Sequence, residues 1–225
     1  MARSRPSAEE SGRDLFASER PRPLAGSLSS LAKQAESCER CPLFANATQT
    51  VFGEGPRRAP VVFVGEQPGD REDLEGRPFV GPAGRLFDRA LAEAGVDRAQ
   101  VYVTNAVKHF KFEPRGKRRL HKKPNTSEID ACRWWLDREL ALIRPKVTVA
   151  LGATAAQALM GHAVTIARQR GRLIALREGL SGFVTVHPSF LLRLPDAAAK
   201  EAEYARFVGD LRKVAAEVPA IRAAA

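Results

Sequence analysis

The chain has 225 residues, a length that suits one domain with a sizeable core. Its 36 Lys and Arg residues exceed its 26 Asp and Glu residues, which gives a net charge of +10. This excess indicates an acidic partner, with nucleic acid as the leading candidate and a membrane surface as the second. No stretch approaches the ~20 consecutive apolar residues of a membrane span, which argues against a membrane protein.

The N-terminal region, residues 1–23, is polar and charged and lacks the apolar centre of a signal peptide, so we expect a disordered tail there. We expect one folded domain over residues 24–217 and a short C-terminal tail over residues 218–225. The 3 cysteines are too few and too odd in number for a disulfide scaffold. Together with the missing signal they indicate a reducing, cytoplasmic setting, and a monomer is the default expectation.

The pattern along the chain alternates between short apolar runs and helical segments. A short helix is expected over residues 27–36, and a last amphipathic helix over about residues 196–217. Four nearly continuous β-branched runs are typical of strands buried on both faces: residues 60–64, 101–104, 146–151 and 183–186. Three helical patterns lie between them: residues 84–94, 126–143 and 153–160. This alternation predicts a three-layer α/β/α sandwich around a central, mainly parallel four-stranded sheet, and residues 172–176 are a candidate for a further strand.

Polar and glycine-rich segments follow each of the four runs, where the predicted strands end. They are Gly65–Asp70, Asn105, Gly152–Thr154 and His187–Ser189. Any one of them is also compatible with an ordinary turn. Because open parallel sheets bind ligands at the carboxyl ends of their strands, their convergence on one edge predicts a site there.

The first of these segments offers two carboxylates on a tight turn. Glycines allow the backbone to approach a ligand, and Glu66 and Asp70 can orient water or stabilise a developing positive charge. The alternative is a turn whose acids simply face solvent. Neither GxxxxGK[ST] nor a GxGxxG after a strand is present, which argues against a nucleotide cofactor.

Three further side chains suit recognition of a planar base. Phe79, flanked by Pro and Gly, can stack on a base or, equally well, plug the core. Asn105 carries a donor and an acceptor on one side chain, which complements a pyrimidine edge with one N–H and one C=O. His187 can donate to a carbonyl that becomes anionic as a base leaves.

A basic segment, residues 117–123, places His121 among five Lys and Arg residues. Gly116 and Pro124 bound the segment, so we expect a loop rather than a helix. The surrounding cations favour a neutral imidazole with a free lone pair, which is a nucleophile or a base. A solvated basic loop with an incidental histidine is the alternative for this segment taken alone.

The cysteines favour a metal site over redox chemistry. Cys38 and Cys41 form a C-x2-C pair without an adjacent βαβ pattern, and Cys132 lies on a predicted helix. His109 is the best candidate for a fourth ligand. Such a set suits either structural zinc or an iron–sulfur cluster, and three unrelated buried thiols remain the alternative.

Taken together, these residues resemble the uracil-DNA glycosylase superfamily, and most closely its iron–sulfur branch, family four. The resemblance runs from about residue 31 to residue 214. The motifs that carry it are Cys38-x2-Cys41, Gly65–Gly69, Pro78–Gly84, Thr104–Lys108 and His187–Ser189.

Three departures from family four are similar to the UdgX class. Family four usually has Ala where this chain has Gln67, and Cys where it has His109. It also lacks the basic, His-bearing insertion of residues 116–123, which in the UdgX class reads K-R-R-I-H. Here the corresponding residues are Lys117, Arg118, Arg119, Leu120 and His121.

The resemblance implies a role for each residue in the recognition and release of uracil. Uracil is flipped out of single- or double-stranded DNA into the pocket, where Phe79 stacks on it and Asn105 reads its Watson–Crick edge. His187 steadies the charge on O2, and Gly65 and Gln67 line the pocket. The carboxylates of Glu66 and Asp70 face the sugar and support its cationic state.

The resemblance also implies how the reaction ends and what supports the fold. In the UdgX class the loop histidine, here His121, bonds to C1′ of the sugar in place of water and leaves a stable DNA–protein link. The basic side chains of Lys117, Arg118 and Arg119, with Ser189, contact the DNA. A structural 4Fe–4S cluster is held by Cys38, Cys41, His109 and Cys132, and zinc is the less favoured occupant.

Three hypotheses remain open on the sequence. The first is single-turnover excision of uracil with covalent capture through His121. The second is a conventional multiple-turnover glycosylase in which His121 only grips DNA. The third is a metal-stapled nucleic-acid-binding module without catalysis, disfavoured because Glu66, Asn105 and His187 would then have no reason to meet.

Overall fold

The computed structural model describes residues 26–176 and 180–223, so the expected N-terminal tail lies outside the described residues. Its centre is a sheet of five strands in the order β2-β1-β5-β7-β6. The strands are β1 (Val61–Gly65), β2 (Val101–Asn105), β5 (Val147–Leu151), β6 (Leu173–Ala175) and β7 (Ser181–Thr185). The four predicted strands all form and run parallel to one another.

The central sheet has five strands rather than four, because the candidate strand over residues 172–176 forms as β6 and adds an antiparallel edge to β7. This strand has three residues, and two of them are exposed. An edge strand of this kind lacks the long buried apolar run by which the other strands are recognised, so its sequence signal is weak.

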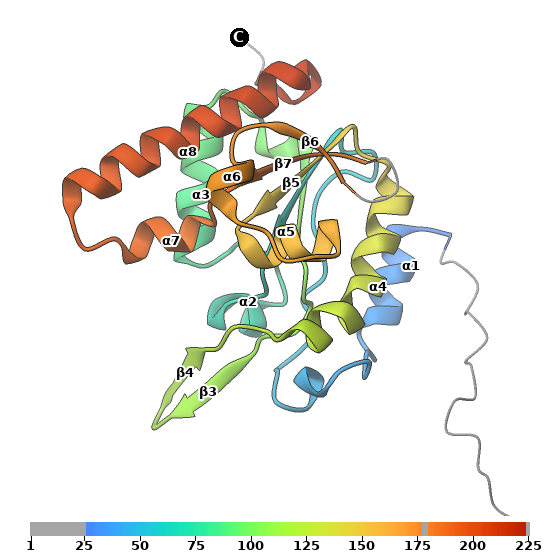
Figure 1. Cartoon of the computed structure of the whole chain (residues 1–225). Coiled ribbons are helices and arrows are strands. Elements are labelled where there is room, and N and C mark those ends of the chain that lie inside the picture. Colours follow the sequence, from blue (N-terminus) through green and yellow to red (C-terminus); the bar gives the residue numbers. More distant parts are fainter. Residues whose placement is uncertain (1–25, 177–179, 224–225) are drawn as a thin grey trace, which may run out of the picture.

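Helices cover both faces of the sheet and form the expected sandwich (Figure 1). On one face lie α1 (Leu28–Ala35), α4 (Thr126–Ile143) and α5 (Ala153–Met160); on the other lie α3 (Pro82–Glu93), α7 (Pro188–Arg193) and α8 (Ala197–Glu217). Strand β1 shows why two cores form, since Val62 and Val64 pack on the first face while Val61 and Phe63 pack on the second. None of the helices in the described residues is long and apolar enough to span a membrane.

The remaining elements are short. Two helices of a few residues, α2 (Asp70–Glu75) and α6 (Ile166–Gln169), follow β1 and α5, and three 3-10 turns are η1 (Pro42–Ala45), η2 (Arg98–Gln100) and η4 (Pro219–Ile221). The last turn corrects the predicted C-terminal tail. Val218 and Ile221 are buried, and the backbone N–H of Ala223 donates to the carbonyl of Gly95 at 3.0 Å, so the domain continues beyond residue 217.

The basic segment is a β-hairpin and not the predicted loop. Strands β3 (Phe112–Arg115) and β4 (Arg118–His121) pair antiparallel, with Phe112 opposite His121, and the hairpin projects from the body beside α2 (Figure 1). Gly116 begins the two-residue turn with φ +59°, which suits a tight hairpin. The pattern was hidden because the strands are largely solvent-exposed and carry charged side chains at half of their positions.

Candidate active site

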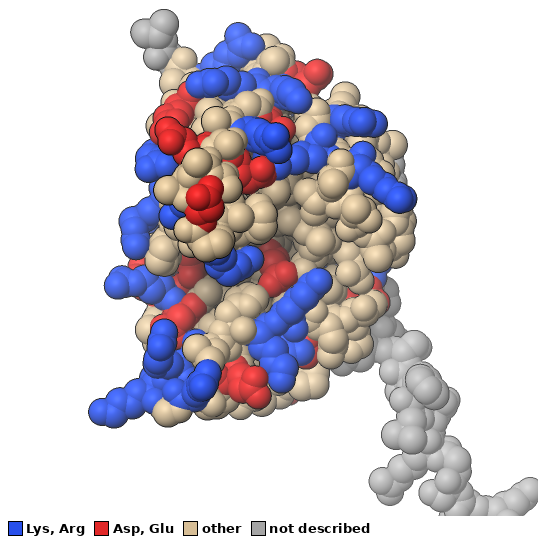
Figure 2. Space-filling view, turned by 60° about the vertical axis from the view of Figure 1, so that its left-hand side comes forward, with Lys and Arg blue, Asp and Glu red and all other residues tan. Residues whose placement is uncertain are grey.

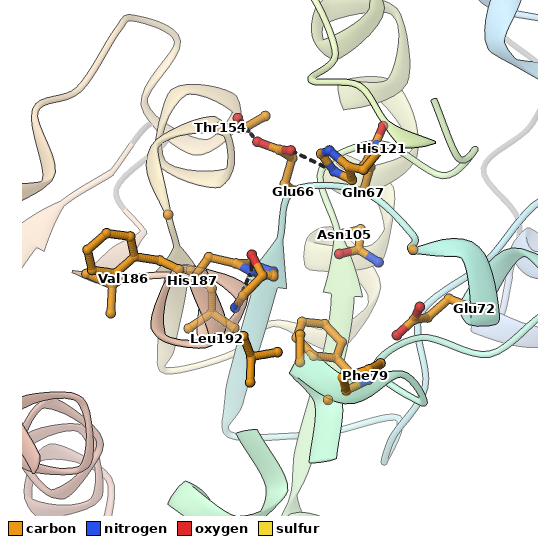
Figure 3. A pocket seen from close by; sticks show the side chains of 18 of the residues that line it. Glu66, Gln67, Glu72, Phe79, Asn105, His121, Thr154, Val186, His187 and Leu192 are labelled. Atoms are coloured by element: carbon orange, nitrogen blue, oxygen red, sulfur yellow. Dashed lines mark hydrogen bonds and ion pairs between the residues drawn. The ribbon is translucent and has the colours of Figure 1, made fainter. Parts of the chain in front are cut away.

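A cavity of about 910 Å³ opens at the carboxyl ends of β1, β2, β5 and β7 (Figure 3). It is lined by the segments after these strands, by α7 and by His121 of the hairpin. The structure thereby brings together six side chains of the predicted base and sugar site: Glu66, Gln67, Phe79, Asn105, His121 and His187. Asp70 and Ser189 also line the cavity.

The floor of the cavity lies between Phe79 and Asn105. A Cβ atom on Gly65 would lie 2.3 Å from Oδ1 of Asn105 and 3.0 Å from Cζ of Phe79, so only glycine allows these two side chains to lie this close to the end of β1. Phe79 packs on Phe87 with ring centroids 5.3 Å apart while its other side faces the cavity. The ring therefore belongs to the core and also lines the cavity, a position that is compatible with both alternatives left by the sequence.

The backbone at Phe79 has an unusual conformation, which is maintained by close packing on Gly84 and by a hydrogen bond at Gly81. Phe79 has φ +60°, a region that bulky residues rarely adopt. Its carbonyl oxygen would lie 1.6 Å from a Cβ on Gly84, so the loop closes over a glycine. The buried carboxylate of Glu72 accepts from the backbone N–H of Gly81 at 2.8 Å and holds the loop end. Such over-determined strain is typical of functional sites.

Asn105 is fixed from behind by a buried ion pair. The ammonium of Lys108, which is 0% exposed, donates to the backbone carbonyl oxygen of Asn105 at 2.8 Å and to Oγ1 of Thr104 at 2.6 Å. It also pairs with the equally buried carboxylate of Glu139. That carboxylate accepts from the hydroxyl of Tyr102 at 2.9 Å, so the charges are paired and hydrogen-bonded as buried charges must be. The network therefore holds the backbone from which the Asn105 side chain projects.

His187 follows β7 and is the N-cap of α7. Its Nδ1 accepts from the backbone N–H of Ser189 at 3.1 Å, and the Ser189 hydroxyl lies 2.8 Å from the same nitrogen. Burial lowers the pKa of His187 to about 4, against the opposing effect of Glu66. The ring is therefore neutral at pH 7 with its proton on Nε2, which leaves an N–H donor for a ligand.

Glu66 connects the end of β1 to the hairpin and to α5. One carboxylate oxygen, Oε1, lies 3.2 Å from Nε2 of His121, and the other, Oε2, accepts from the hydroxyl of Thr154 (Figure 3). Burial alone would raise the pKa of Glu66, but these two hydrogen bonds outweigh it and the pKa is lowered. Glu66 is thus an anion within the cavity, in contact with the imidazole that the sequence singled out.

The hairpin is attached to the body through Gln67. Its amide nitrogen donates to the carbonyl oxygens of Lys111 and Lys122 at 3.1 and 3.2 Å, and its amide oxygen accepts from the N–H of Lys111 at 3.1 Å. Lys111 and Lys122 flank the two strands, so one buried amide fastens both ends of the hairpin. This contact explains a glutamine at this position better than lining of the cavity alone.

Arg119 has a different environment from the one expected. Its guanidinium pairs with Asp70 and Asp73 at 2.6 Å each and lies over the rings of Phe110 and Phe112. The arginine that was expected to contact phosphate thus anchors β4 on α2. Asp70, expected to face a sugar, is the partner of Arg119 and lies at the exposed edge of the cavity.

The surface that surrounds the site is basic. Lys117 and Arg118 at the hairpin tip are exposed. Figure 2 shows a hollowed face of the molecule with Lys and Arg side chains around the hollow. A polyanion can approach this face with favourable electrostatics.

The four predicted metal ligands are all buried: Cys38 and Cys41 lie between α1 and η1, Cys132 lies on α4, and His109 lies in the segment after β2. Cys38 accepts from the indole N–H of Trp135 at 3.0 Å, and Cys132 accepts from the backbone N–H of Lys108 at 3.1 Å. Burial raises the pKa of the Cys132 thiol to about 12. These are thiols of the apolar core that a soft metal would have to deprotonate.

His109 supplies the observation that favours a metal. The Thr50 hydroxyl donates to the carbonyl of Ala35 at 2.8 Å, so it accepts from Nε2 of His109, 2.9 Å away. The other ring nitrogen, Nδ1, is buried and has no hydrogen-bond partner among the described residues. Yet no group of three or more His, Cys, Asp or Glu side chains in residues 26–176 and 180–223 is arranged to hold a metal ion. The donor chemistry fits a soft metal, whereas the ligands are not drawn together.

Sequence reasoning missed the residues that hold the site in place. Thr154, Glu72, Lys108 and Glu139 were not assigned roles, although Thr154 stood in one of the segments that follow a strand. Each acts through a contact between segments far apart in the chain, such as the 88 residues between Glu66 and Thr154. The only signal available was the presence of charged residues inside otherwise apolar patterns.

Comparison with known proteins places this architecture in a family. Residues 52–212 match the model of the uracil DNA glycosylase superfamily, and the chain therefore belongs to that superfamily. It is 42% identical over 164 residues to the type-4 uracil-DNA glycosylase of Thermotoga maritima, covering 72% of this chain and 82% of the relative. It is 34% identical over 192 residues to the type-4 uracil-DNA glycosylase of Archaeoglobus fulgidus, covering 82% and 93%. A type-5 uracil-DNA glycosylase of Pyrobaculum aerophilum is 29% identical over 186 residues, covering 68% and 78%.

Proposed function

We propose that this protein removes uracil from single- or double-stranded DNA and captures the resulting abasic sugar through His121, as in the UdgX class. The observation that carries the proposal is the contact between His121 and Glu66 inside the strand-end cavity, 3.2 Å between Nε2 and Oε1. Membership of the superfamily and the names of the type-4 relatives support the first half of the proposal. The hairpin supports the second half.

Recognition of the base uses the floor of the cavity. A flipped uracil stacks on Phe79 and pairs its N–H and C=O edge with the amide of Asn105. Gly65 allows Asn105 and Phe79 to lie close to the end of β1, and both side chains line the cavity that would receive the base. The neutral His187 donates its Nε2 proton to O2, where negative charge gathers as the base leaves.

Cleavage breaks the bond between C1′ and N1, and the electron pair leaves with uracil. The sugar becomes a cation, which the anionic Glu66 stabilises. We assign Asp70 to holding Arg119 and the hairpin, since its carboxylate is already paired at 2.6 Å.

Capture follows when an imidazole lone pair of His121 forms a bond to C1′. The ring takes over the positive charge of the sugar, and this charge lies beside the Glu66 carboxylate. Water at ~55 M competes for the same cation, but a well-placed group reaches effective molarities of about 10⁵ M or more. Position alone therefore decides in favour of the histidine.

Binding to DNA uses the basic rim of the cavity. We assign phosphate contacts to Lys117 and Arg118, which are exposed at the hairpin tip, and to Ser189 at the mouth of the cavity. Neutralising a phosphate releases counterions, so each such lysine or arginine should contribute about one unit to the salt dependence of binding. Arg119 supports these contacts indirectly by fixing the strand that carries them.

A 4Fe–4S cluster held by Cys38, Cys41, Cys132 and His109 completes the proposal, with zinc as the less favoured occupant. The unpartnered Nδ1 of His109 supports this assignment. Such a group supplies a cross-link between the N-terminal segment and α4, and uracil release needs no electron from it. Absorbance near 400 nm that disappears in His109→Ala would support the cluster, and a colourless zinc protein would refute it.

The test of the whole proposal is a denaturing gel. Purified protein is mixed with a labelled single-stranded oligonucleotide that contains one uracil, heated in SDS and separated. We expect a band shifted by about the mass of the protein, absent with thymine and absent for His121→Ala. DNA that runs free but breaks at the uracil after alkali would instead establish a conventional glycosylase, and intact DNA would point to a binding module.

A further inference from the structure

The carboxylate that contacts His121 is itself held by a residue on another element. Thr154 is the second residue of α5 and is 1% exposed. Its hydroxyl donates to Oε2 of Glu66, which leaves Oε1 for His121 (Figure 3). The three side chains thus form one line from α5 through the end of β1 to β4.

Each link in this line depends on the one before it. The terminal torsion of a glutamate is broad, so an unrestrained carboxylate can rotate or tilt away from its partner. Thr154 is suited to prevent this, because a β-branched side chain in a helix has few χ1 rotamers and its burial fixes the donor. His121 is 49% exposed at its side chain, and Glu66 is its polar side-chain partner among the described residues. The direction of the imidazole therefore depends on the direction of the carboxylate.

We propose that Thr154 is a positioning residue for covalent capture: its hydroxyl orients Glu66, and through Glu66 it orients the imidazole of His121 toward C1′. This inference rests on the proposed function of the site and extends it to a residue outside the predicted set. In the captured state the N–C1′ bond has formed from the imidazole lone pair, the base has left with its electron pair, and the Glu66 carboxylate faces the charged ring. Thr154 takes no part in bond making.

The inference predicts an effect on the outcome of the reaction more than on its first step. Without the Thr154 hydroxyl, Glu66 remains near the sugar and still stabilises the cation, so uracil release continues. The imidazole then loses its fixed direction, and water takes a larger share of the cations. We expect the ratio of cross-linked product to free abasic product to fall about tenfold or more, the size expected for loss of a hydrogen bond to a charged group.

The test uses Thr154→Val, which keeps the shape of the side chain and removes the hydroxyl. Single-turnover reactions with the uracil oligonucleotide are divided between an SDS gel, which measures cross-link, and alkali treatment, which measures total uracil release. Thr154→Ser should restore most of the ratio, because it returns the hydroxyl with more rotamer freedom. Thr148→Val is the matched control, since Thr148 is also buried and its hydroxyl has no partner among the described residues.

The outcomes separate this inference from the proposed function. If wild type forms no cross-link, the proposed function fails first. If wild type forms the cross-link and Thr154→Val keeps the same ratio, the positioning role is refuted. Failure of Thr154→Ser to restore the ratio would also refute it, since packing and not the hydroxyl would then matter. Should Thr154→Val not fold, as judged by circular dichroism, Thr154→Ala replaces it in the same comparison.

Discussion

The floor of the cavity and the hairpin wall beside it are supported in different ways. The floor, where Phe79, Asn105 and His187 line the cavity, comes from strand ends and from loops next to the core. The hairpin wall, which carries His121, stands outside the sheet and is held by the Gln67 amide and the Arg119 ion pairs. In the proposed function, base recognition and capture therefore rest on separate supports, so each can be disturbed without the other.

The largest effect, on the free energy of unfolding, is expected from removal of the buried ion pair between Lys108 and Glu139. Lys108→Met leaves the carboxylate of Glu139 buried without its cation, which should lower the free energy of unfolding by about 3–5 kcal/mol. Urea denaturation measures the change, with Lys146→Met as an exposed control. The double variant Lys108→Met/Glu139→Leu should recover part of the loss; a cost below about 1 kcal/mol for the single variant would contradict the buried pair.

Filling the floor should abolish recognition while sparing the fold. In Gly65→Ala the new methyl group meets Oδ1 of Asn105 and Cζ of Phe79 at 2.3 and 3.0 Å, so these side chains must move. Displacements of this size cost about a hundredfold in rate, and we expect uracil release to fall by at least that factor. Gly209→Ala, where no atom lies within 4 Å of the added carbon, is the matched control. Near-normal release by Gly65→Ala would refute the assigned position of the base.

Loosening the hairpin should affect capture and leave recognition in place. Gln67→Ala removes the hydrogen bonds to Lys111 and Lys122, so the hairpin loses its attachment at both ends. We expect the yield of cross-link per uracil released to fall about tenfold, with release itself changed by less than about threefold. The gel and alkali assays measure both quantities, and Gln100→Ala is an exposed control. Equal losses of release and capture would mean that the two walls are not independent.

The smallest effect is the contribution of His187 to the pH dependence of the free energy of unfolding. Burial lowers the pKa of His187 in the folded protein to about 4, against 6.5 for the ordinary side chain. Between these values the unfolded chain binds a proton that the folded protein does not, so stability falls as the pH falls through this window. Wild type should lose about 1 kcal/mol more than His187→Asn between pH 7 and pH 5.5. Urea denaturation at both pH values measures the difference, and an identical loss in the variant would contradict a neutral, buried ring.

The central sheet and most of the helices could be predicted from the sequence because their signals are local. The β-branched runs predicted four strands, and the helical pattern over residues 126–143 predicted α4 with the bounds that the structure gives it. The hairpin was missed because its strands are short, charged and exposed, so neither burial nor period distinguishes them. The same limit applied to the site. Its residues follow strands and could be named, whereas the contacts between Glu66 and Thr154 and between Arg119 and Asp73 join segments that only the fold brings together.

The pairing of the hairpin also bears on how such a protein could arise. Strands β3 and β4 pair with each other as a separate two-stranded sheet, and in the described residues neither joins the central sheet. The stretch between residues 111 and 122 could therefore be gained or lost in a single insertion or deletion without shifting the register of any core strand. On the body, the side chains that contact the hairpin include Gln67, Asp70 and Asp73, with Glu66 and Thr48 beside them. Descent of a self-capturing protein from a turnover ancestor, or the reverse, would then require few genetic steps.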